Sequence, residues 1–337
     1  MAEFPRAEKF TLSGDHQPVG RLPEAIELSV HQILGTSGSH APAVVFCHGF
    51  PDLAYSWRHQ LETVGHAGFR AVAPDQRGYG NSSSPEQIEA FGLGQLCGDL
   101  VELLDALEID TAVFVGHDWG GFVAWGMPVL FPERCAGVVG VCTPYTPFPT
   151  TEFLKMMFGE DLEQMYMLWF QSPGVAEAIL DTRARLLFEK LSVCGVDPLR
   201  LAELGMARES GFNFNPFIDL EGLPNVAPSV LTAQDLDLYS STFERTGFRG
   251  PLNWYRNIDQ NAVNFPEVGT QALQLPALMI CAEWDPALPP ELASGMPLLC
   301  SDLEMHTVAK AGHWVHEEFP DRVNHLIVDW LTRKFVS

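Results

Sequence analysis

The residue with the most distinctive surroundings is Asp118, at the centre of the run GHDWGG at 116–121. This run joins an apolar segment at 111–115 to a helical pattern. Its spacing is typical of a nucleophile elbow, a sharp strand-to-helix turn that exposes its central side chain. Asp is also a favoured N-cap, so Asp118 could merely cap the helix that begins near Gly120. We favour the elbow, because a helix cap does not need glycine on both sides of it.

An aspartate at the centre of such a turn predicts a particular class of electrophile. A serine that attacked a saturated carbon would form an ether, which water does not readily cleave. A carboxylate forms an alkyl ester whose acyl carbon belongs to the enzyme, and this ester can be hydrolysed if an oxyanion hole and an activated water are directed at Asp118 itself. The expected substrates therefore carry an electrophilic sp3 carbon, as epoxides and alkyl halides do, whereas esterase and peptidase activities are disfavoured.

Two backbone N–H groups are candidates for the oxyanion hole. The turn HGFP at 48–51 follows the apolar run 43–47, and the N–H of Phe50 would complement that of Trp119, the residue after the nucleophile. By itself, HG-x-P also fits an ordinary Gly-Pro turn. Because the oxyanion hole adjoins the reacting atoms, we also expect Phe50 and Trp119 to contact the substrate.

His313 is the candidate general base. It lies in AGHW at 311–314, after the last predicted strand at 303–308 and before the final helix, which fits the chain order nucleophile, acid, histidine. His316 is the alternative, although it falls at the entry to that helix. His117 adjoins the nucleophile, and we interpret it as structural because neighbouring side chains point apart at an elbow.

The acid that orients His313 has two usual locations, one after the strand predicted at 277–281 and one after the strand predicted at 137–142. The second is excluded because the loop there holds no Asp or Glu. The first offers Glu283 and Asp285. We favour Asp285, which lies further past the strand end, and keep Glu283 as the alternative. A buried carboxylate would hold the imidazole tautomer and stabilise the imidazolium that forms.

Short apolar runs alternate along the chain with longer amphipathic stretches. The predicted strands are 25–34, 43–47, 69–73, 111–115, 137–142, 277–281 and 303–308, and the predicted helices are 55–64, 93–107, 120–131 and 321–335. Apolar strands that alternate with amphipathic helices predict an α/β fold with a mostly parallel central sheet, flanked by helices on both faces.

The alternation is interrupted between residues 144 and 265. This stretch is rich in Met, Phe, Leu and acidic residues at helical spacing, for example at 163–171 and 233–245, without a convincing strand. We therefore predict a core formed by 1–143 and 266–337, and an all-helical insertion, 144–265. The insertion would cover the carboxyl ends of the strands, where ligands of open α/β sheets bind.

The composition bears on partners and location. The 337 residues include 20 Lys and Arg against 43 Asp and Glu, a formal charge of -23, which disfavours nucleic acid and anionic membranes as partners. The seven cysteines form no CxxC pair, so neither structural zinc nor a disulfide framework is predicted, and no cofactor is expected. The N-terminus lacks a secretory signal, and no apolar run approaches the roughly 18 residues of a membrane span. We expect a soluble, cytoplasmic monomer or homodimer that acts on a small molecule.

Together these motifs resemble those of the α/β-hydrolase-fold epoxide hydrolases of the soluble type, from about Glu24 to the C-terminus. The shared segments are HGFP at 48–51, SWRHQ at 56–60, DQRGYG at 75–80, GHDWGG at 116–121, FQSPGVAE at 170–177, GFRGPLNWYR at 247–256 and AGHW at 311–314. The resemblance implies an α/β-hydrolase fold whose helical insertion is a cap domain, and a cis bond between Phe50 and Pro51. It also implies conversion of epoxides to vicinal diols through an alkyl ester on the nucleophile, hydrolysed by water that His and Asp activate.

The resemblance further implies two tyrosines in the insertion that hydrogen-bond the epoxide oxygen. One matches Tyr255, within RGPLNWYR. The other matches Tyr166, because the position at which the family often has a second tyrosine holds Trp169 here. The residues expected to act on the substrate are then Asp118, His313, Asp285, Tyr166 and Tyr255, with Phe50 and Trp119 in the oxyanion hole.

Two other functions remain open at this stage. A haloalkane dehalogenase would share the Asp-Trp pair, but that family commonly has Asn, whose amide binds the halide, where this chain has Phe50. Opening an epoxide also requires a proton donor for the ring oxygen, and the two tyrosines can supply it, which favours an epoxide hydrolase. A binding protein with an inactive site is disfavoured, because every catalytic position holds a competent residue.

Overall fold

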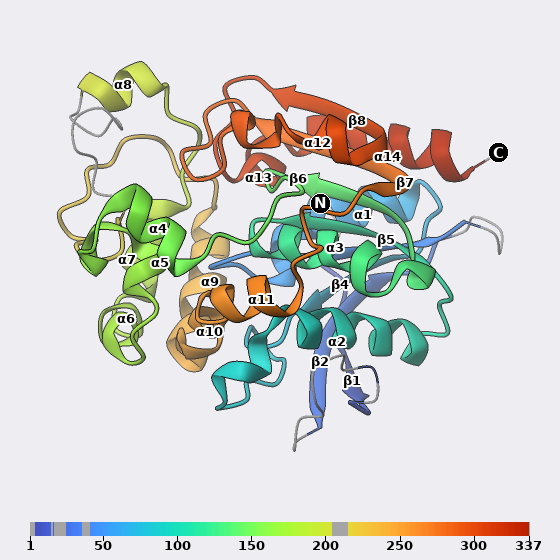
Figure 1. The fold of residues 1–337 in the computed structure, drawn as a ribbon, viewed down its shortest axis with the longest axis horizontal. Coiled ribbons are helices and arrows are strands. Elements are labelled where there is room, and N and C mark those ends of the chain that lie inside the picture. Colours follow the sequence, from blue (N-terminus) through green and yellow to red (C-terminus); the bar gives the residue numbers. More distant parts are fainter. Residues whose placement is uncertain (1–3, 15, 17–24, 36–40, 204–214, 337) are drawn as a thin grey trace.

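The computed structural model describes residues 4–14, 16, 25–35, 41–203 and 215–336. An eight-stranded sheet forms its centre, in the order β1-β2-β4-β3-β5-β6-β7-β8 (Figure 1). The strands are β1 (Glu8–Leu12), β2 (Ile26–Ile33), β3 (Ala43–Cys47), β4 (Ala71–Asp75), β5 (Ala112–His117), β6 (Cys135–Val141), β7 (Leu273–Ala282) and β8 (Cys300–Val308). β2 pairs antiparallel with β1 and β4, and the other neighbouring pairs are parallel. The prediction of a mostly parallel sheet is confirmed.

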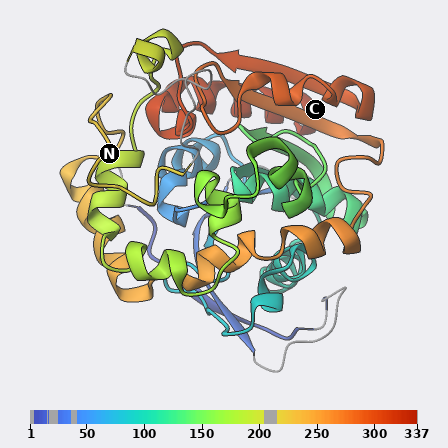
Figure 2. The ribbon, with the colours of Figure 1, turned by 60° about the vertical axis from the view of Figure 1, so that its left-hand side comes forward.

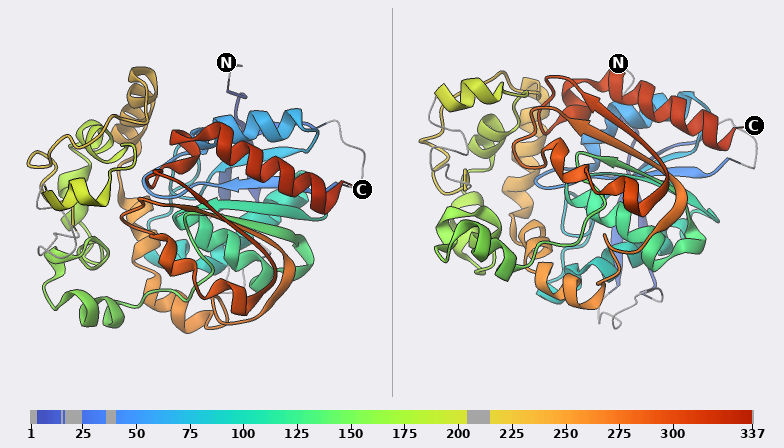
Figure 3. Two further views of the ribbon diagram at one scale, coloured as in Figure 1. Left: turned by 90° about the horizontal axis from the view of Figure 1, so that it is seen from above. Right: turned by 45° about the horizontal axis from the view of Figure 1, so that its top comes forward.

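Helices flank both faces of this sheet. The longer ones are α1 (Arg58–His66), α2 (Leu93–Ala106), α3 (Trp119–Leu130) and α14 (Pro320–Phe335), and the shorter ones are η1 (Ala54–Trp57), η2 (Ile88–Phe91), η3 (Pro132–Arg134), η6 (Pro290–Ala293), α12 (Met296–Leu299) and α13 (Val315–Glu318). α1 and α14 lie side by side on one face (Figure 3), and α2 and α3 cover the other. Each face of the sheet has its own hydrophobic core. Val44 and Phe46 of β3 pack in the core beneath α1 and α14, and Val45 and Cys47 pack in the core beneath α2 and α3, as alternation along a strand requires.

Between β6 and β7 the chain forms a succession of helices. They are α4 (Thr151–Phe158), η4 (Leu162–Gln164), α5 (Tyr166–Trp169), α6 (Val175–Leu180), α7 (Ala184–Leu191), α8 (Pro198–Glu203), α9 (Ala233–Thr246), α10 (Arg249–Tyr255) and α11 (Ile258–Asn264). Within the described part of this segment, the only strand-like pairing is an isolated bridge between Val193 and Ser229. The helices lie beyond the carboxyl ends of the parallel strands (Figures 1 and 2).

Three local predictions differ from the structure. The edge strand β1 was not expected, since it is short and mostly exposed. The helical pattern at 163–171 is split into η4 and α5, because Met165 between them has an extended backbone with φ -130 and ψ 118. The helix expected at 55–64 begins as the 3-10 turn η1 and becomes α-helical only at Arg58.

Two further observations bear on the class of protein. No helix in the part of the chain that the structure describes is long and apolar enough to cross a membrane. The seven cysteines are free thiols, and all of them except Cys194 are buried.

Candidate active site

Asp118 occupies a strained turn between β5 and α3. Its backbone has φ 50 and ψ -123, in the left-handed region that residues with a side chain rarely adopt. A Cβ atom on Gly116 would lie 2.1 Å from the carbonyl oxygen of Gly120, and one on Gly120 would lie 2.0 Å from that of Cys47. The Asp118 side chain makes no capping hydrogen bond to α3. The two glycines therefore serve the sharp turn, and the Asp118 side chain does not act as the N-cap of α3.

Backbone donors from two elements converge on the Asp118 carboxylate. The N–H of Phe50 donates to Oδ1 at 2.8 Å, and the N–H of Trp119 also hydrogen-bonds the carboxylate. The bond between Phe50 and Pro51 is cis. A Cβ atom on Gly49 would lie 2.5 Å from the Cβ of Asp118, so only glycine allows the two turns to approach so closely. The structure thus brings both predicted oxyanion donors to the nucleophile candidate.

His313 lies between two carboxylates. Its Nδ1 is 2.9 Å from Oδ2 of Asp285, and its Nε2 is 3.9 Å from Oδ2 of Asp118. Oδ1 of Asp285 accepts the N–H groups of Ala287 and Leu288 at 2.8 and 2.9 Å, which fix the acid in place. The ring of His313 is therefore oriented by Asp285 and presents its other nitrogen to Asp118.

The alternative acid, Glu283, and the alternative base, His316, make other contacts. The Glu283 side chain is exposed and accepts the backbone N–H of Lys310 at 2.7 Å. His316 is fully buried, and its nearest carboxylate oxygen, Oδ2 of Asp52, is 4.0 Å away. Of the two acids considered, Asp285 is the one that contacts His313.

The charges of these three groups are coupled. Burial raises the pKa of Asp118, while the nearby His313 lowers it without cancelling the effect. Burial lowers the pKa of His313, but the charges of Asp285 and Asp118 outweigh this and raise it to about 9. Burial raises the pKa of Asp285, but His313 and the backbone donors hold it at about 2. At neutral pH His313 is therefore an imidazolium paired with the ionised Asp285, and it faces Asp118 on its other side.

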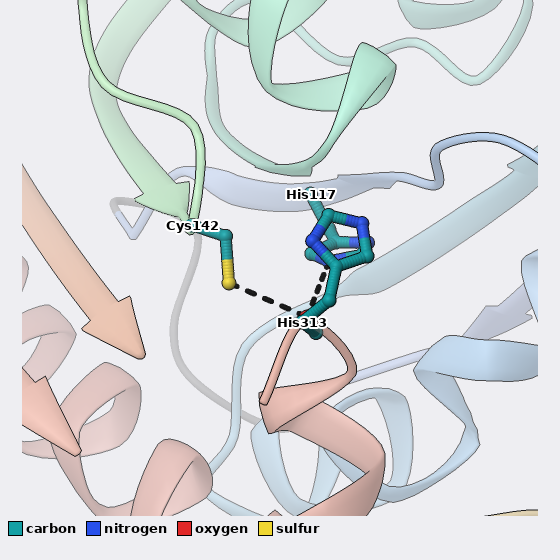
Figure 4. Close-up of side chains that lie close together, drawn as sticks. All are labelled: His117, Cys142 and His313. Atoms are coloured by element: carbon teal, nitrogen blue, oxygen red, sulfur yellow. Dashed lines mark hydrogen bonds between the residues drawn. The ribbon is translucent and has the colours of Figure 1, made fainter. Parts of the chain in front are cut away.

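Two neutral side chains hold the main chain of His313. Nε2 of His117 and Sγ of Cys142 donate to the carbonyl oxygen of His313 at 2.9 and 3.4 Å (Figure 4). Burial lowers the pKa of His117 well below its ordinary value and raises that of the Cys142 thiol well above it. Both groups are therefore uncharged hydrogen-bond donors, and His117 supports the loop that carries His313.

Tyr166 and Tyr255 come together above the elbow from separate helices. Their rings are 5.8 Å apart between centroids, edge to face, and their hydroxyl groups are hydrogen-bonded to each other. Tyr255 also packs edge-on against Trp119, at 5.0 Å, and against Phe50, at 5.1 Å. Burial, and then the nearby Asp118, raises the pKa of Tyr166. The same two causes act on Tyr255, so both phenols stay protonated at neutral pH.

A buried polar cluster next to the site was not predicted from the sequence. Asp52 follows the cis proline, and its Oδ1 accepts the hydroxyl of Tyr239 on α9 at 2.7 Å. Burial raises the pKa of Asp52 to about 7 and that of Glu317 to about 8, although Arg58 pairs with Glu317. The sequence feature that could have indicated this cluster is an acidic residue directly after each motif: Asp52 after HGFP and Glu317 after AGHWVH.

Two groups of described residues bring potential metal ligands within 4.8 Å of one another: His117, Cys142 and His313, and Asp52, His117 and His316. In the first, Cys142 is a protonated thiol that already donates to a carbonyl, whereas zinc binds a thiolate. In the second, the positive charge of Arg58 acts on both Asp52 and His316 and would repel a cation. Neither group has the donor chemistry of a resident metal site.

The strand order, the Asp-bearing elbow and the His-Asp pair define an α/β hydrolase, and residues 42–190 match the family model described as the alpha/beta hydrolase fold. The chain belongs, more narrowly, to the epoxide hydrolases. It is 38% identical over 296 residues to epoxide hydrolase A of Mycobacterium tuberculosis, covering 87% of this chain and 91% of that one. It is 37% identical to the mouse bifunctional epoxide hydrolase 2 over 86% of this chain, and spans about half (51%) of that relative.

Solved structures agree with this assignment. Epoxide hydrolase A from Mycobacterium thermoresistibile superposes with a TM-score of 0.82 at 35% identity, over 96% of this chain and 98% of the other. An epoxide hydrolase from an endophytic Streptomyces gives a TM-score of 0.79 at 32% identity, over 96% and 95% of the two chains.

Proposed function

We propose that this enzyme converts epoxides to vicinal diols in two steps, through an ester on Asp118. The observation that carries the proposal is the unequal surroundings of the two carboxylate oxygens. Oδ1 accepts the N–H of Phe50 at 2.8 Å, while Oδ2 lies on the side of His313. Oδ2 is then the nucleophile, and Oδ1 is the oxygen that becomes the oxyanion.

In the first step Oδ2 of Asp118 attacks an epoxide carbon and the C–O bond of the ring breaks. The charge that develops on the epoxide oxygen needs hydrogen bonds or a proton in the transition state. Tyr166 and Tyr255 supply both, since they lie together over the elbow and remain protonated. The product of this step is a hydroxyalkyl ester of Asp118.

In the second step water attacks the carbonyl carbon of that ester. His313 takes a proton from the water, and the negative charge develops on Oδ1, which the N–H groups of Phe50 and Trp119 stabilise. The tetrahedral intermediate then expels the diol oxygen, which His313 protonates. Asp118 is regenerated with one oxygen from water, and the diol carries the former Oδ2.

The interaction between the charges of Asp118 and His313 explains why ester formation precedes base-assisted hydrolysis. While Asp118 is ionised, its charge helps to keep His313 protonated. Esterification removes that charge, so the pKa of His313 falls. The imidazolium can then return a proton, through water, to the tyrosinate left by the first step, which leaves a neutral imidazole that can act as a base. His313 therefore becomes a base only once the Asp118 ester has formed.

In this mechanism the helical insertion, 144–265, is a cap domain, and it supplies the two tyrosines to the active site. The core is made of 1–143 and 266–337. The substrate is a small-molecule epoxide, and no cofactor takes part in the steps above. We include in the proposal a cytoplasmic location, a part in detoxification of reactive epoxides, and a monomeric or homodimeric state.

The discriminating experiment is incubation of the purified enzyme with an epoxide and, separately, with a 1-haloalkane. Formation of diol from the first and no halide from the second is the expected result. Halide release would favour dehalogenase chemistry, although Phe50 has no side-chain donor for a halide. Asp118→Asn is the control for enzyme-dependent turnover, and it should form no diol.

A further inference from the structure

The loop that carries His313 is joined to a segment of the helical insertion just after α7. The indole Nε1 of Trp314 donates to the carbonyl of Leu191 at 2.8 Å. The carboxylate of Glu318 accepts the N–H of Gly195, at 3.0 and 3.1 Å to its two oxygens, and the N–H of Gly312, at 2.8 Å to Oε2. One side chain thus holds the residue before His313 and a residue of the insertion at the same time.

The two backbones are in direct contact at this point. A Cβ atom on Gly195 would lie 2.5 Å from the backbone N of Gly312, and one on Gly312 would lie 2.6 Å from the Cα of Gly195. Because the obstructing atoms are main chain, neither glycine has room for a side chain. The position of the loop before His313 is therefore set partly by where segment 191–195 lies.

Glu318 is well placed to fix this arrangement. It is the last residue of α13, which begins directly after Trp314, and its own N–H bonds the Trp314 carbonyl at 2.8 Å. Its carboxylate folds back over Gly312, is half-buried, and makes charge-assisted hydrogen bonds to backbone N–H groups, which are stronger than neutral ones. Glu283, directly after β7, also contacts this loop: its exposed side chain accepts the N–H of Lys310.

We propose that Glu318 is a positioning residue for the hydrolytic step: it links the Gly312–His313 backbone to segment 191–195, so that His313 is correctly placed only while this contact is made. The inference rests on the proposed function, in which His313 serves ester hydrolysis and not ester formation. Loss of Glu318 should consequently slow the second step and spare the first, because Asp118 and the tyrosines are held by other contacts.

The test uses the full-length chain and resolves the two steps. Glu318→Ala should form the Asp118 ester, followed by Trp fluorescence and intact mass, within about threefold of the wild-type rate. Its hydrolysis should be slower by about 10- to 100-fold, since small misplacement of a catalytic group costs up to about 100-fold. Glu318→Gln should fall between, because its amide oxygen can still accept one N–H. Gly195→Ala places a Cβ atom of the insertion against the Gly312 backbone and should show the same selective slowing.

Glu283→Ala is the matched control, since it removes the acceptor of the Lys310 N–H, on the same loop as His313, without a contact to the insertion; its hydrolysis rate should change less than about threefold. The pH profile of hydrolysis should also shift in Glu318→Ala, because a displaced ring meets Asp285 differently. Wild-type hydrolysis in Glu318→Ala, or equal loss of both steps, would overturn the proposal. If the wild-type enzyme itself forms no ester, the proposed function fails first, and this role for Glu318 fails with it.

Discussion

Nε2 of His313 lies 3.9 Å from Oδ2 of Asp118. This distance is too long for a hydrogen bond but short enough for a strong interaction between charges in a buried site. The proposed nucleophile and the proposed base therefore influence each other's protonation without a hydrogen bond between them. Once Asp118 is esterified the interaction ends, and His313 can act on water next to the ester carbonyl.

His313→Gln should separate the two steps. Alkylation of Asp118 needs no base, so the variant should still react with epoxide, and its intact mass should rise by the mass of one epoxide molecule. Hydrolysis should be slowed by at least about 100-fold, the usual range for loss of a general base. His325→Gln, an exposed residue on α14, is the matched control. Normal turnover in His313→Gln would transfer the role of base to another residue, with His316 the first candidate.

The pKa of His313 should respond to each carboxylate in a defined order. It is raised to about 9, and Asp285 contributes more to this than Asp118 does. NMR titration of the ring should therefore give a lower pKa in Asp118→Asn and a still lower one in Asp285→Asn. An unchanged pKa in both variants would refute the charge coupling.

The same coupling predicts a pH dependence of stability. The folded-state pKa of His313 is above the ordinary value of about 6.5, so its ion pairing stabilises the fold fully below about pH 6.5. The contribution is lost as the pH rises through about 9. Denaturant unfolding should show a smaller decline over this range in Asp118→Asn than in the wild type. An equal decline would mean that other groups cause it.

The tyrosine pair should show non-additive losses. Tyr166→Phe and Tyr255→Phe each leave one donor, so each should lose roughly 10- to 100-fold in alkylation rate, and the double variant should be nearly inactive. Trp119 adjoins the nucleophile, so Trp fluorescence should follow this step. Tyr145→Phe, whose hydroxyl binds the carbonyl of Gln271, is the control.

Ionisation of the same hydroxyls should inhibit alkylation at alkaline pH. Because burial and Asp118 raise the pKa of both, the fall should begin above the ordinary phenol value of about 10. A double variant that alkylates at the wild-type rate would remove the tyrosines from the mechanism and reopen the dehalogenase alternative.

Asp118, His313 and Asp285, which the structure brings together, could be named as candidates from the sequence because each lies in a turn with its own local signature. Asp118 is marked by flanking glycines, and His313 follows an Ala-Gly pair after the last strand. The tyrosines lie in helices, and only the family resemblance pointed to them. The edge strand β1 could not be predicted, because a short, exposed strand lacks a hydrophobic pattern. The contacts of Asp52 with Tyr239 and of Glu318 with Gly195 join residues 187 and 123 positions apart. Such pairs depend on how the insertion packs on the core, which no local pattern encodes.

In the proposed mechanism, Asp118 donates one of its own oxygens to the first diol. The most direct measurement is a single turnover in ¹⁸O-labelled water with enzyme in excess over epoxide, followed by mass analysis of both diol and protein. We expect unlabelled diol and one ¹⁸O atom in the protein, in the peptide that contains Asp118. Label in the diol of that first turnover, with none in the protein, would contradict the ester intermediate and show that water attacks the epoxide directly.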